Sequence, residues 1–131
     1  MRRTLAAAAA YFVIVFGLAF LLGVVRTIVI APRVGDLAAV LIETPVILLI
    51  SWWAAHWSIR QFSIPAGVAD RLGLGLVAFL LLMSAETALS HLLFDRSFAQ
   101  QFAAYSTPAG AIGLAAQTVF GLIPLVAARR R

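Results

Sequence analysis

The fold is decided by residues 72–94, LGLGLVAFLLLMSAETALSHLLF, an uninterrupted run that is long and apolar enough to cross a bilayer. Glu86 stands inside this run, with Ser84 and Thr87 close to it. An ionised carboxylate near the bilayer centre costs about 2.5–3.5 kcal/mol on insertion scales, so something has to compensate it. Each of the other three apolar runs supplies a polar residue that we expect at a similar depth: Arg26, Glu43 and Gln117. The sequence therefore predicts a polar layer, formed by these residues, inside a four-helix membrane bundle.

The composition of the chain indicates an integral membrane protein. Of its 131 residues, 63% are hydrophobic and only 11% are charged, which is too little polar surface for a water-soluble domain. The length allows one domain of about four spans at about 20 residues each. It leaves no room for a soluble catalytic domain, so we predict that the protein is not an enzyme. Because the chain has no cysteine, disulfides and thiolate metal sites are excluded.

Hydrophobic runs and helix-breaking residues give the expected boundaries. The first run is longer than the hydrophobic region of a signal peptide, which has about 7–15 residues. We therefore expect it to be an uncleaved helix that ends at Pro32 and Gly35. Asp36 and Thr107 are expected N-cap residues, and Pro45 should bend the second helix. The sequence predicts one all-α transmembrane domain, 1–131, with helices at about 5–31, 36–58, 71–94 and 108–128.

The segment between the third and fourth spans has features of a short helix. Phe98, Phe102 and Tyr105 are spaced four and three residues apart, and Ser97 with Gln100 reads as a capping box. We therefore expect a short amphipathic helix within residues 95–107 that lies in the membrane interface.

Arginine counting predicts the orientation. All ten basic residues are arginines and the net charge is +5. With four spans, seven arginines fall on the side of the termini and of loop 60–71, and three fall on the other side. The positive-inside rule then places both termini in the cytoplasm, and we assign the chain to a bacterial inner (plasma) membrane. Its partner there is the lipid bilayer and not nucleic acid. The expected interfacial anchors are Trp52, Trp53, Trp57, Arg129, Arg130 and Arg131.

Chain symmetry suggests which members of the polar layer meet. Arg26 and Glu43 are symmetric about the turn at Gly35, so we predict an ion pair within that hairpin. Glu43 and Glu86 are likewise symmetric about the middle of loop 60–71. One arginine neutralises one glutamate. Glu86 is then left without a cation, and its protonated form is the one that costs least free energy inside the membrane. Its expected partners are Gln117, Ser84 and Thr87.

The polar layer has a structural and a functional interpretation. It can act as interhelical glue, although such hydrogen bonds average only about 0.6 kcal/mol each and seldom use a glutamate pair with an arginine. Intramembrane ionisable residues more often mark ion or proton pathways. His56 and His91 fall near opposite faces and so would not ligate one haem. Glu86 and His91 are about 140° apart around their helix, and we expect no metal or cofactor.

Two classes of function remain. The first is a small proton- or ion-coupled transporter or channel that acts as a homo-oligomer, because four short helices enclose little space on their own. The second is a non-catalytic accessory or structural subunit of a larger membrane protein complex, in which the polar layer faces a partner. An enzyme acting on lipids ranks third. Neither a phosphate-binding glycine loop nor a hydrolase motif is present in the sequence.

Overall fold

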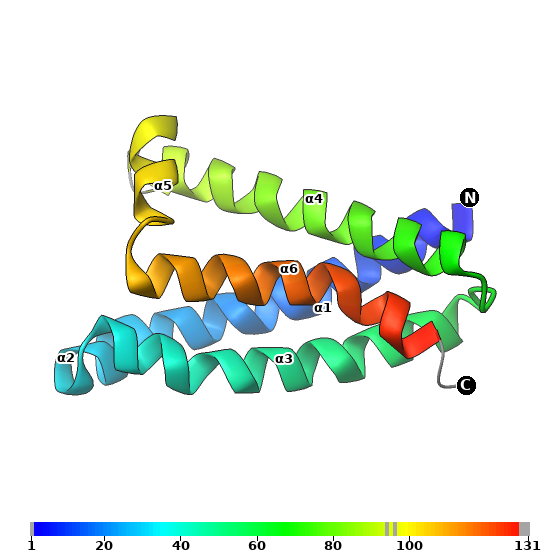
Figure 1. The fold of residues 1–131 in the computed structure, drawn as a ribbon, viewed down its shortest axis with the longest axis horizontal. Coiled ribbons are helices and arrows are strands. Elements are labelled where there is room, and N and C mark those ends of the chain that lie inside the picture. Colours follow the sequence, from blue (N-terminus) through cyan, green and yellow to red (C-terminus); the bar gives the residue numbers. More distant parts are fainter. Residues whose placement is uncertain (1, 94, 96, 129–131) are drawn as a thin grey trace.

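In the computed structural model the chain forms a bundle of four long helical segments, with a short helix at one end (Figure 1). The structure describes residues 2–93, 95 and 97–128. The long segments are Arg2–Val34, α3 (Asp36–Gln61), α4 (Val68–Leu93) and α6 (Pro108–Ala128). Each is long and apolar enough to cross a membrane. The protein is therefore an all-helical, multi-pass membrane protein, and the prediction of an all-α bundle of four spans is confirmed.

The first span differs from its predicted form because the helix continues through Pro32. It consists of α1 (Arg2–Val25), a π-helical turn η1 (Arg26–Ile30) and α2 (Ala31–Val34). In the π turn the backbone N–H of Ala31 donates to the carbonyl of Arg26. This wider turn accommodates proline, which lacks an N–H and whose ring would clash with the preceding turn of an α-helix. The helix ends at Gly35, whose φ of +89° suits glycine.

The second and third spans are longer at their shared loop than the sequence suggests. Gly35, not Asp36, is the N-cap residue of α3, and no side chain caps this end. The helix α3 extends to Gln61, three residues beyond its predicted end at 58. The helix α4 begins at Val68, three residues before its predicted start at 71. The loop between them is consequently only six residues long, 62–67.

Arginine side chains hold this short loop. Arg71 donates from Nε to the carbonyl of Pro65 at 2.9 Å and from Nη2 to that of Ile64 at 3.3 Å. Arg3 donates to the carbonyl of Ser63 at 3.4 Å. Loop carbonyls that lack helical partners are thereby satisfied. Arg71, which the charge count treats only as a topology signal, is buried and has a structural role.

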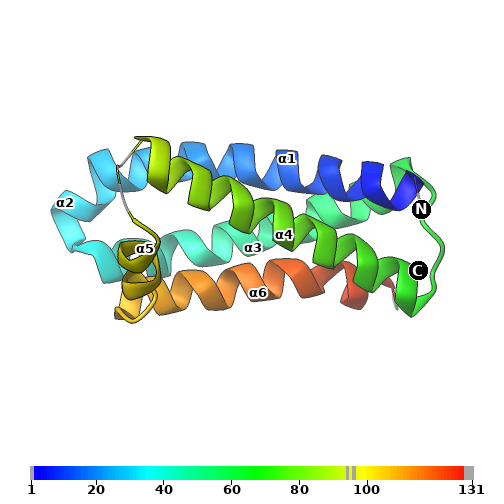
Figure 2. The same cartoon turned by 90° about the horizontal axis from the view of Figure 1, so that it is seen from above.

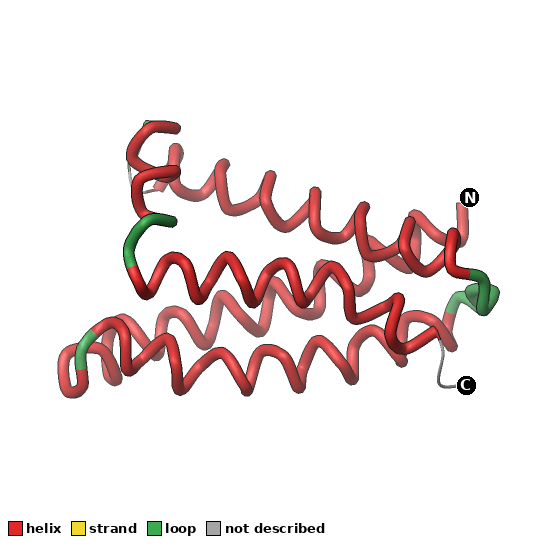
Figure 3. The backbone as a smooth tube through the Cα atoms, in the orientation of Figure 1, coloured by secondary structure: helices red, strands yellow, loops and turns green. Residues whose placement is uncertain are grey.

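The four spans form a ring in the order α1, α3, α6, α4. Close backbone contacts join α1 to α3 and α4, and join α6 to the same two helices. Thus α1 lies opposite α6, and α3 lies opposite α4 (Figure 2). The start of α1, the end of α6 and loop 62–67 share one end of the bundle, while α2 and α5 (Phe98–Ala104) lie at the other (Figures 1 and 3).

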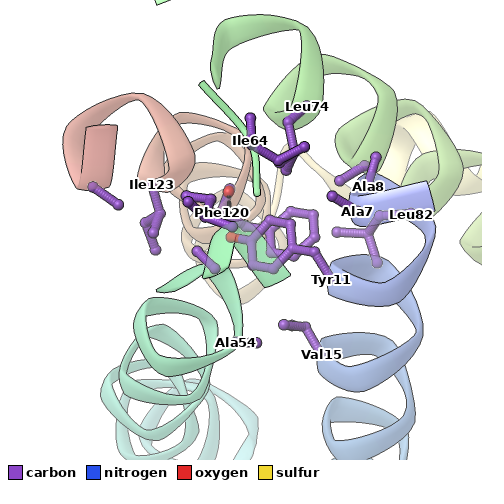
Figure 4. Packing of buried hydrophobic residues seen from close by; sticks show 14 residues of the cluster. Ala7, Ala8, Tyr11, Val15, Ala54, Ile64, Leu74, Leu82, Phe120 and Ile123 are labelled. Carbon is purple, nitrogen blue, oxygen red and sulfur yellow. Dashed lines mark hydrogen bonds between the residues drawn. The ribbon is translucent and has the colours of Figure 1, made fainter. Parts of the chain in front are cut away.

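The bundle is tightly packed at one end and loosely packed at the other. Most buried apolar residues come from the half that holds the termini: Ala7, Ala8, Tyr11, Val15, Ala54, Ala55, Leu74, Ala78, Leu82, Phe120, Ile123 and Ala127 (Figure 4). Many are small, which lets membrane helices approach closely. Among the described residues of 16–50 and 83–119, only Ala39 and Gln101 are buried. The half that holds the predicted polar layer is therefore open.

A tyrosine at the centre of the packed half compensates for a proline. Pro124 lies within α6 and has no N–H, so the carbonyl of Phe120, four residues earlier, lacks its helical partner. The Tyr11 hydroxyl donates to that carbonyl at 2.6 Å, and the two aromatic rings stack with centroids 4.4 Å apart (Figure 4). Tyr11 thus joins α1 to α6 across the diagonal of the ring.

This contact makes the effect of Tyr11→Phe depend on Pro124. In the natural chain we expect the substitution to lower the free energy of unfolding by about 1–3 kcal/mol, because the carbonyl of Phe120 loses the hydroxyl that donates to it. In a Pro124→Ala background the new backbone N–H can bond that carbonyl, so the cost of Tyr11→Phe should become much smaller. Unfolding titrations of the four proteins of this cycle measure the difference. Equal costs in both backgrounds would contradict the interpretation.

Candidate functional site

The ion pair predicted within the first hairpin is present. Arg26 Nε donates to Glu43 Oε1 at 2.7 Å. Arg26 is the first residue of the π turn η1, and Glu43 lies seven residues into α3. The side chain of Glu43 is 10% exposed and that of Arg26 is 31% exposed. The carboxylate is thus enclosed, while the guanidinium reaches the edge of the bundle.

A second polar pair joins α4 to α6. The amide of Gln117 donates from Nε2 to Glu86 Oε2, as the sequence predicts. Both side chains are partly buried. Tyr105, which follows α5, lies close enough to this carboxyl for the charge of Glu86 to raise the pKa of the Tyr105 hydroxyl. The side chain that donates to this carboxyl, Gln117, is therefore neutral, and Arg26 is bound to Glu43 instead.

Two members of this second group were missed by the sequence analysis. Tyr105 follows α5, and the side chain of Gln101 lies near enough to influence the pKa of its hydroxyl. Gln101 is buried and donates from Nε2 to Thr87 Oγ1 on α4 at 3.2 Å. Gln101 and Tyr105 are four residues apart, which is a helical spacing that places them on one face. We call Glu86, Gln117, Tyr105, Gln101 and Thr87 the glutamate cluster.

The environment of Tyr105 keeps its hydroxyl protonated. Burial raises the pKa of Tyr105, a hydrogen bond from Gln101 lowers it, and the charge and hydrogen bond of Glu86 raise it further. The ordinary tyrosine pKa is about 10. The Tyr105 hydroxyl therefore stays protonated at neutral pH.

One atom of the glutamate cluster is unsatisfied. Gln117 Oε1 is buried and has no hydrogen-bond partner. A buried acceptor without a donor costs about 1–3 kcal/mol. A ligand or water that supplied an N–H or O–H at this position would be bound favourably.

The polar layer thus consists of two separate groups and is not continuous. No hydrogen bond or ion pair joins Arg26 and Glu43 to Glu86 and Gln117, all four of which are described. The reason is the ring order: Glu43 and Glu86 are matched in depth by chain symmetry, but α3 and α4 lie on opposite corners. Depth can be read from chain length, whereas the position of a helix around the bundle axis cannot.

Ser84 and Thr87 have different surroundings. Thr87 belongs to the glutamate cluster and also donates to the carbonyl of Met83 at 2.8 Å. Ser84 is exposed and lies with Thr87 and His91 along a groove of about 560 Å³ on α4. A second groove, of about 770 Å³, runs between α3 and α6 and is lined by apolar residues. The groove on α4 is thus the one that carries polar side chains.

Within residues 2–93, 95 and 97–128, no group of three or more His, Asp or Glu residues is placed to hold a metal ion. His56 instead bonds through Nδ1 to the carbonyl of Trp52 at 2.9 Å, one turn earlier on α3. The distance between the two ring centroids is 4.6 Å.

The predicted anchors are only partly described. Trp52 packs against the buried cluster, whereas Trp53 is 56% exposed and Trp57 is partly buried. All three lie in the second half of α3, toward the end of the bundle where α1 begins. Arg129, Arg130 and Arg131 lie outside the described residues.

Comparisons of this chain with protein-family models, with curated proteins and with solved structures find no match.

Proposed function

We propose that the protein is a small proton-coupled transporter or channel in which Glu86 is the group that binds and releases the proton. The observation that carries this proposal is the set of partners around Glu86. Its hydrogen bond comes from the neutral Gln117 side chain, while the arginine of the layer is bound to Glu43. An intramembrane carboxyl without a cation favours the protonated form when its surroundings are apolar and the ionised form when a proton acceptor has access.

The loose packing of the half that holds Glu86 supports a role in which protons must reach this carboxyl. Glu86 lies seven residues from the end of α4, in the half where few residues are buried. A carboxyl used only as glue would be better placed in the packed half, among the residues around Tyr11. The unpartnered Gln117 Oε1 offers a neighbouring acceptor for a hydrated proton or a cationic ligand.

The proposal includes the orientation derived from the arginine distribution. Both termini lie in the cytoplasm of a bacterial cell, the bundle spans the inner membrane, and α5 lies in the outer interface. The exposed Phe102 of α5, which packs edge-on against Tyr105, suits such a position. Because the outer half of one chain encloses little, the pathway forms between copies of a homo-oligomer.

An accessory subunit of a larger complex is the second candidate. Its support is the exposure of apolar and charged groups in the open half, such as Arg26 at 31% and Leu92 at 81%. A partner helix would cover them. Copurification of the tagged protein with other membrane subunits favours this candidate, whereas isolation as a homo-oligomer favours transport.

Proton flux into reconstituted vesicles tests the proposal. With a pH-sensitive dye in the lumen and an imposed membrane potential, we expect wild-type protein to carry protons. Glu86→Gln should abolish this flux, because the amide cannot release a proton. Ser90→Ala, on the same helix and outside the glutamate cluster, is the matched control and should retain it. Equal flux in wild type and Glu86→Gln, or flux no greater than that of empty vesicles, would argue against transport.

A further inference from the structure

We propose that the groove between α3 and α6 binds an anionic phospholipid, with an acyl chain in the groove and the phosphate against Arg60. The groove has a volume of about 770 Å³ and lies between two helices that run side by side (Figures 1 and 2). Its walls come from Pro45 to Trp52 of α3 and from Val119 to Val126 of α6, and every lining residue is apolar or aromatic. This site is separate from the proposed proton pathway and does not depend on it.

The shape of the groove suits an acyl chain better than a helix. Its floor is apolar, since Ile123 is 6% exposed and Leu48 is partly buried. Its rims stand out, since Leu49 is 71% exposed and Leu122 is 45% exposed. The axes of packed helices lie about 8–10 Å apart, whereas a helix with its side chains is about 10–12 Å wide. A helix of a second copy would therefore contact only the rims, while an acyl chain is narrow enough to reach the floor.

The groove approaches the membrane interface at the end of the bundle where the chain termini lie. The helices α3 and α6 run in the same direction, so both walls lead toward that end (Figure 1). On each helix the lining residues extend over seven positions, which is about 10 Å at the helical rise of 1.5 Å per residue. Trp57 follows on α3, and tryptophan is enriched at the level of lipid head groups. The groove thus lies just inside that level, where acyl chains begin.

Arg60 stands beyond the groove on the same face of α3. It is eleven positions after the lining residue Leu49, which places the two about 20° apart around the helix axis. The Cα–Cβ bonds of a helix tilt toward its N-terminus, so the Arg60 side chain leaves the backbone in the direction of the groove. Arg60 is exposed, and within residues 2–93, 95 and 97–128 its guanidinium has no hydrogen bond or ion pair. It is therefore available to a phosphate.

His56 connects the groove to Arg60. It follows the lining residue Trp52 by four positions and precedes Arg60 by four. Its Nδ1 bonds to the carbonyl of Trp52 at 2.9 Å, and the two rings have centroids 4.6 Å apart. Because a carbonyl oxygen only accepts, Nδ1 carries the ring proton and Nε2 of the neutral imidazole is an acceptor. A head group that has a hydroxyl beside its phosphate, such as phosphatidylglycerol, matches both His56 and Arg60.

The charges around the groove favour an anionic head group. From Thr44 to its end at Gln61, α3 contains no acidic residue, and α6 contains no charged residue at all. Among the described residues, the acid at this end of the bundle is Asp70, near the start of α4. The helix α4 lies on the corner opposite α3. No carboxylate on the two walls therefore competes with a phosphate for Arg60 or repels it.

Quenching of Trp52 fluorescence by brominated lipids tests this site. Trp53→Phe and Trp57→Phe leave Trp52, which lines the groove, as the only tryptophan. This parent protein is placed in vesicles of phosphatidylglycerol and phosphatidylcholine, in which one lipid or the other carries bromine on its acyl chains. We expect the groove to prefer phosphatidylglycerol by about 5-fold. Arg60→Gln should remove the preference, whereas Arg60→Lys keeps the charge and should retain most of it.

Arg2→Gln is the matched control, because Arg2 is exposed at the same end of the bundle but belongs to α1. It should keep the preference of the parent protein. Equal quenching by the two lipids in the parent would overturn the site, as would an unchanged preference in Arg60→Gln or an equal loss in Arg2→Gln. If neither brominated lipid quenches Trp52, a second copy of the chain covers the groove and the assignment to a lipid is wrong.

Discussion

Glu43→Gln is expected to lower the free energy of unfolding by about 2 kcal/mol, whereas Glu86→Gln should change it by less than about 0.5 kcal/mol. Removing one partner of a fully buried ion pair costs about 3–5 kcal/mol. We expect a smaller loss of stability here because the Arg26 side chain is 31% exposed and can be partly solvated. Glu86→Gln resembles the protonated carboxyl, so it removes no charge that another residue needs.

A double replacement separates the ion pair from other effects. Arg26→Gln together with Glu43→Gln removes both charges, and its stability should exceed the value expected from adding the two single changes. Unfolding in detergent, followed by circular dichroism, measures all three proteins and Glu86→Gln. If Glu86→Gln proves the more destabilising of the two glutamate substitutions, the assignment of Arg26 to Glu43 as its essential partner is wrong.

Gly75→Ala is expected to destabilise the bundle by about 3 kcal/mol, at the upper end of the range for overpacking. A Cβ atom on Gly75 would overlap the backbone carbonyl oxygen of Gly121. Since that oxygen belongs to the backbone of α6, it cannot move away as the end of a side chain can. The helices α4 and α6 must separate instead.

Gly113→Ala provides the control on α6. A Cβ atom there meets no atom within 4 Å, and alanine is favoured over glycine in a helix by up to about 1 kcal/mol. This variant should therefore be as stable as wild type or slightly more so. Thermal unfolding of both variants makes the comparison. Equal stability of Gly75→Ala and wild type would show that α4 and α6 do not approach as closely as described.

The spans and the first ion pair follow from the sequence because both depend on distance along the chain. Hydrophobic runs fix the number of spans, and the shortness of the turn at Gly35 brings Arg26 opposite Glu43. The capping box of Ser97 and Gln100 is equally local. The pairing of Glu86 with Gln117 also depends on depth, which the lengths of α4 and α6 determine.

The order of the helices around the bundle and the polar contacts of α5 cannot be predicted from distances along the chain. Which faces of the helices meet depends on close backbone approach, such as that of Gly75 to Gly121, and a single sequence offers many small residues of this kind. The stripe of Phe98, Phe102 and Tyr105 predicts an amphipathic helix but not its polar contacts with α4. The same segment also contains Gln101, which in the structure is buried and donates to Thr87 on α4. The π turn was missed because Pro32 ordinarily ends an α-helix.

The protonation state of Glu86 tests the central claim most directly. Infrared spectra of purified protein, recorded across a pH series, can be compared between wild type and Glu86→Gln. We predict a carboxylic acid band in wild type at about pH 5, where a water-exposed glutamate is largely ionised. The band should disappear at higher pH and should be missing at every pH in Glu86→Gln. Spectra showing that Glu86 is already fully ionised at about pH 5 would contradict the account.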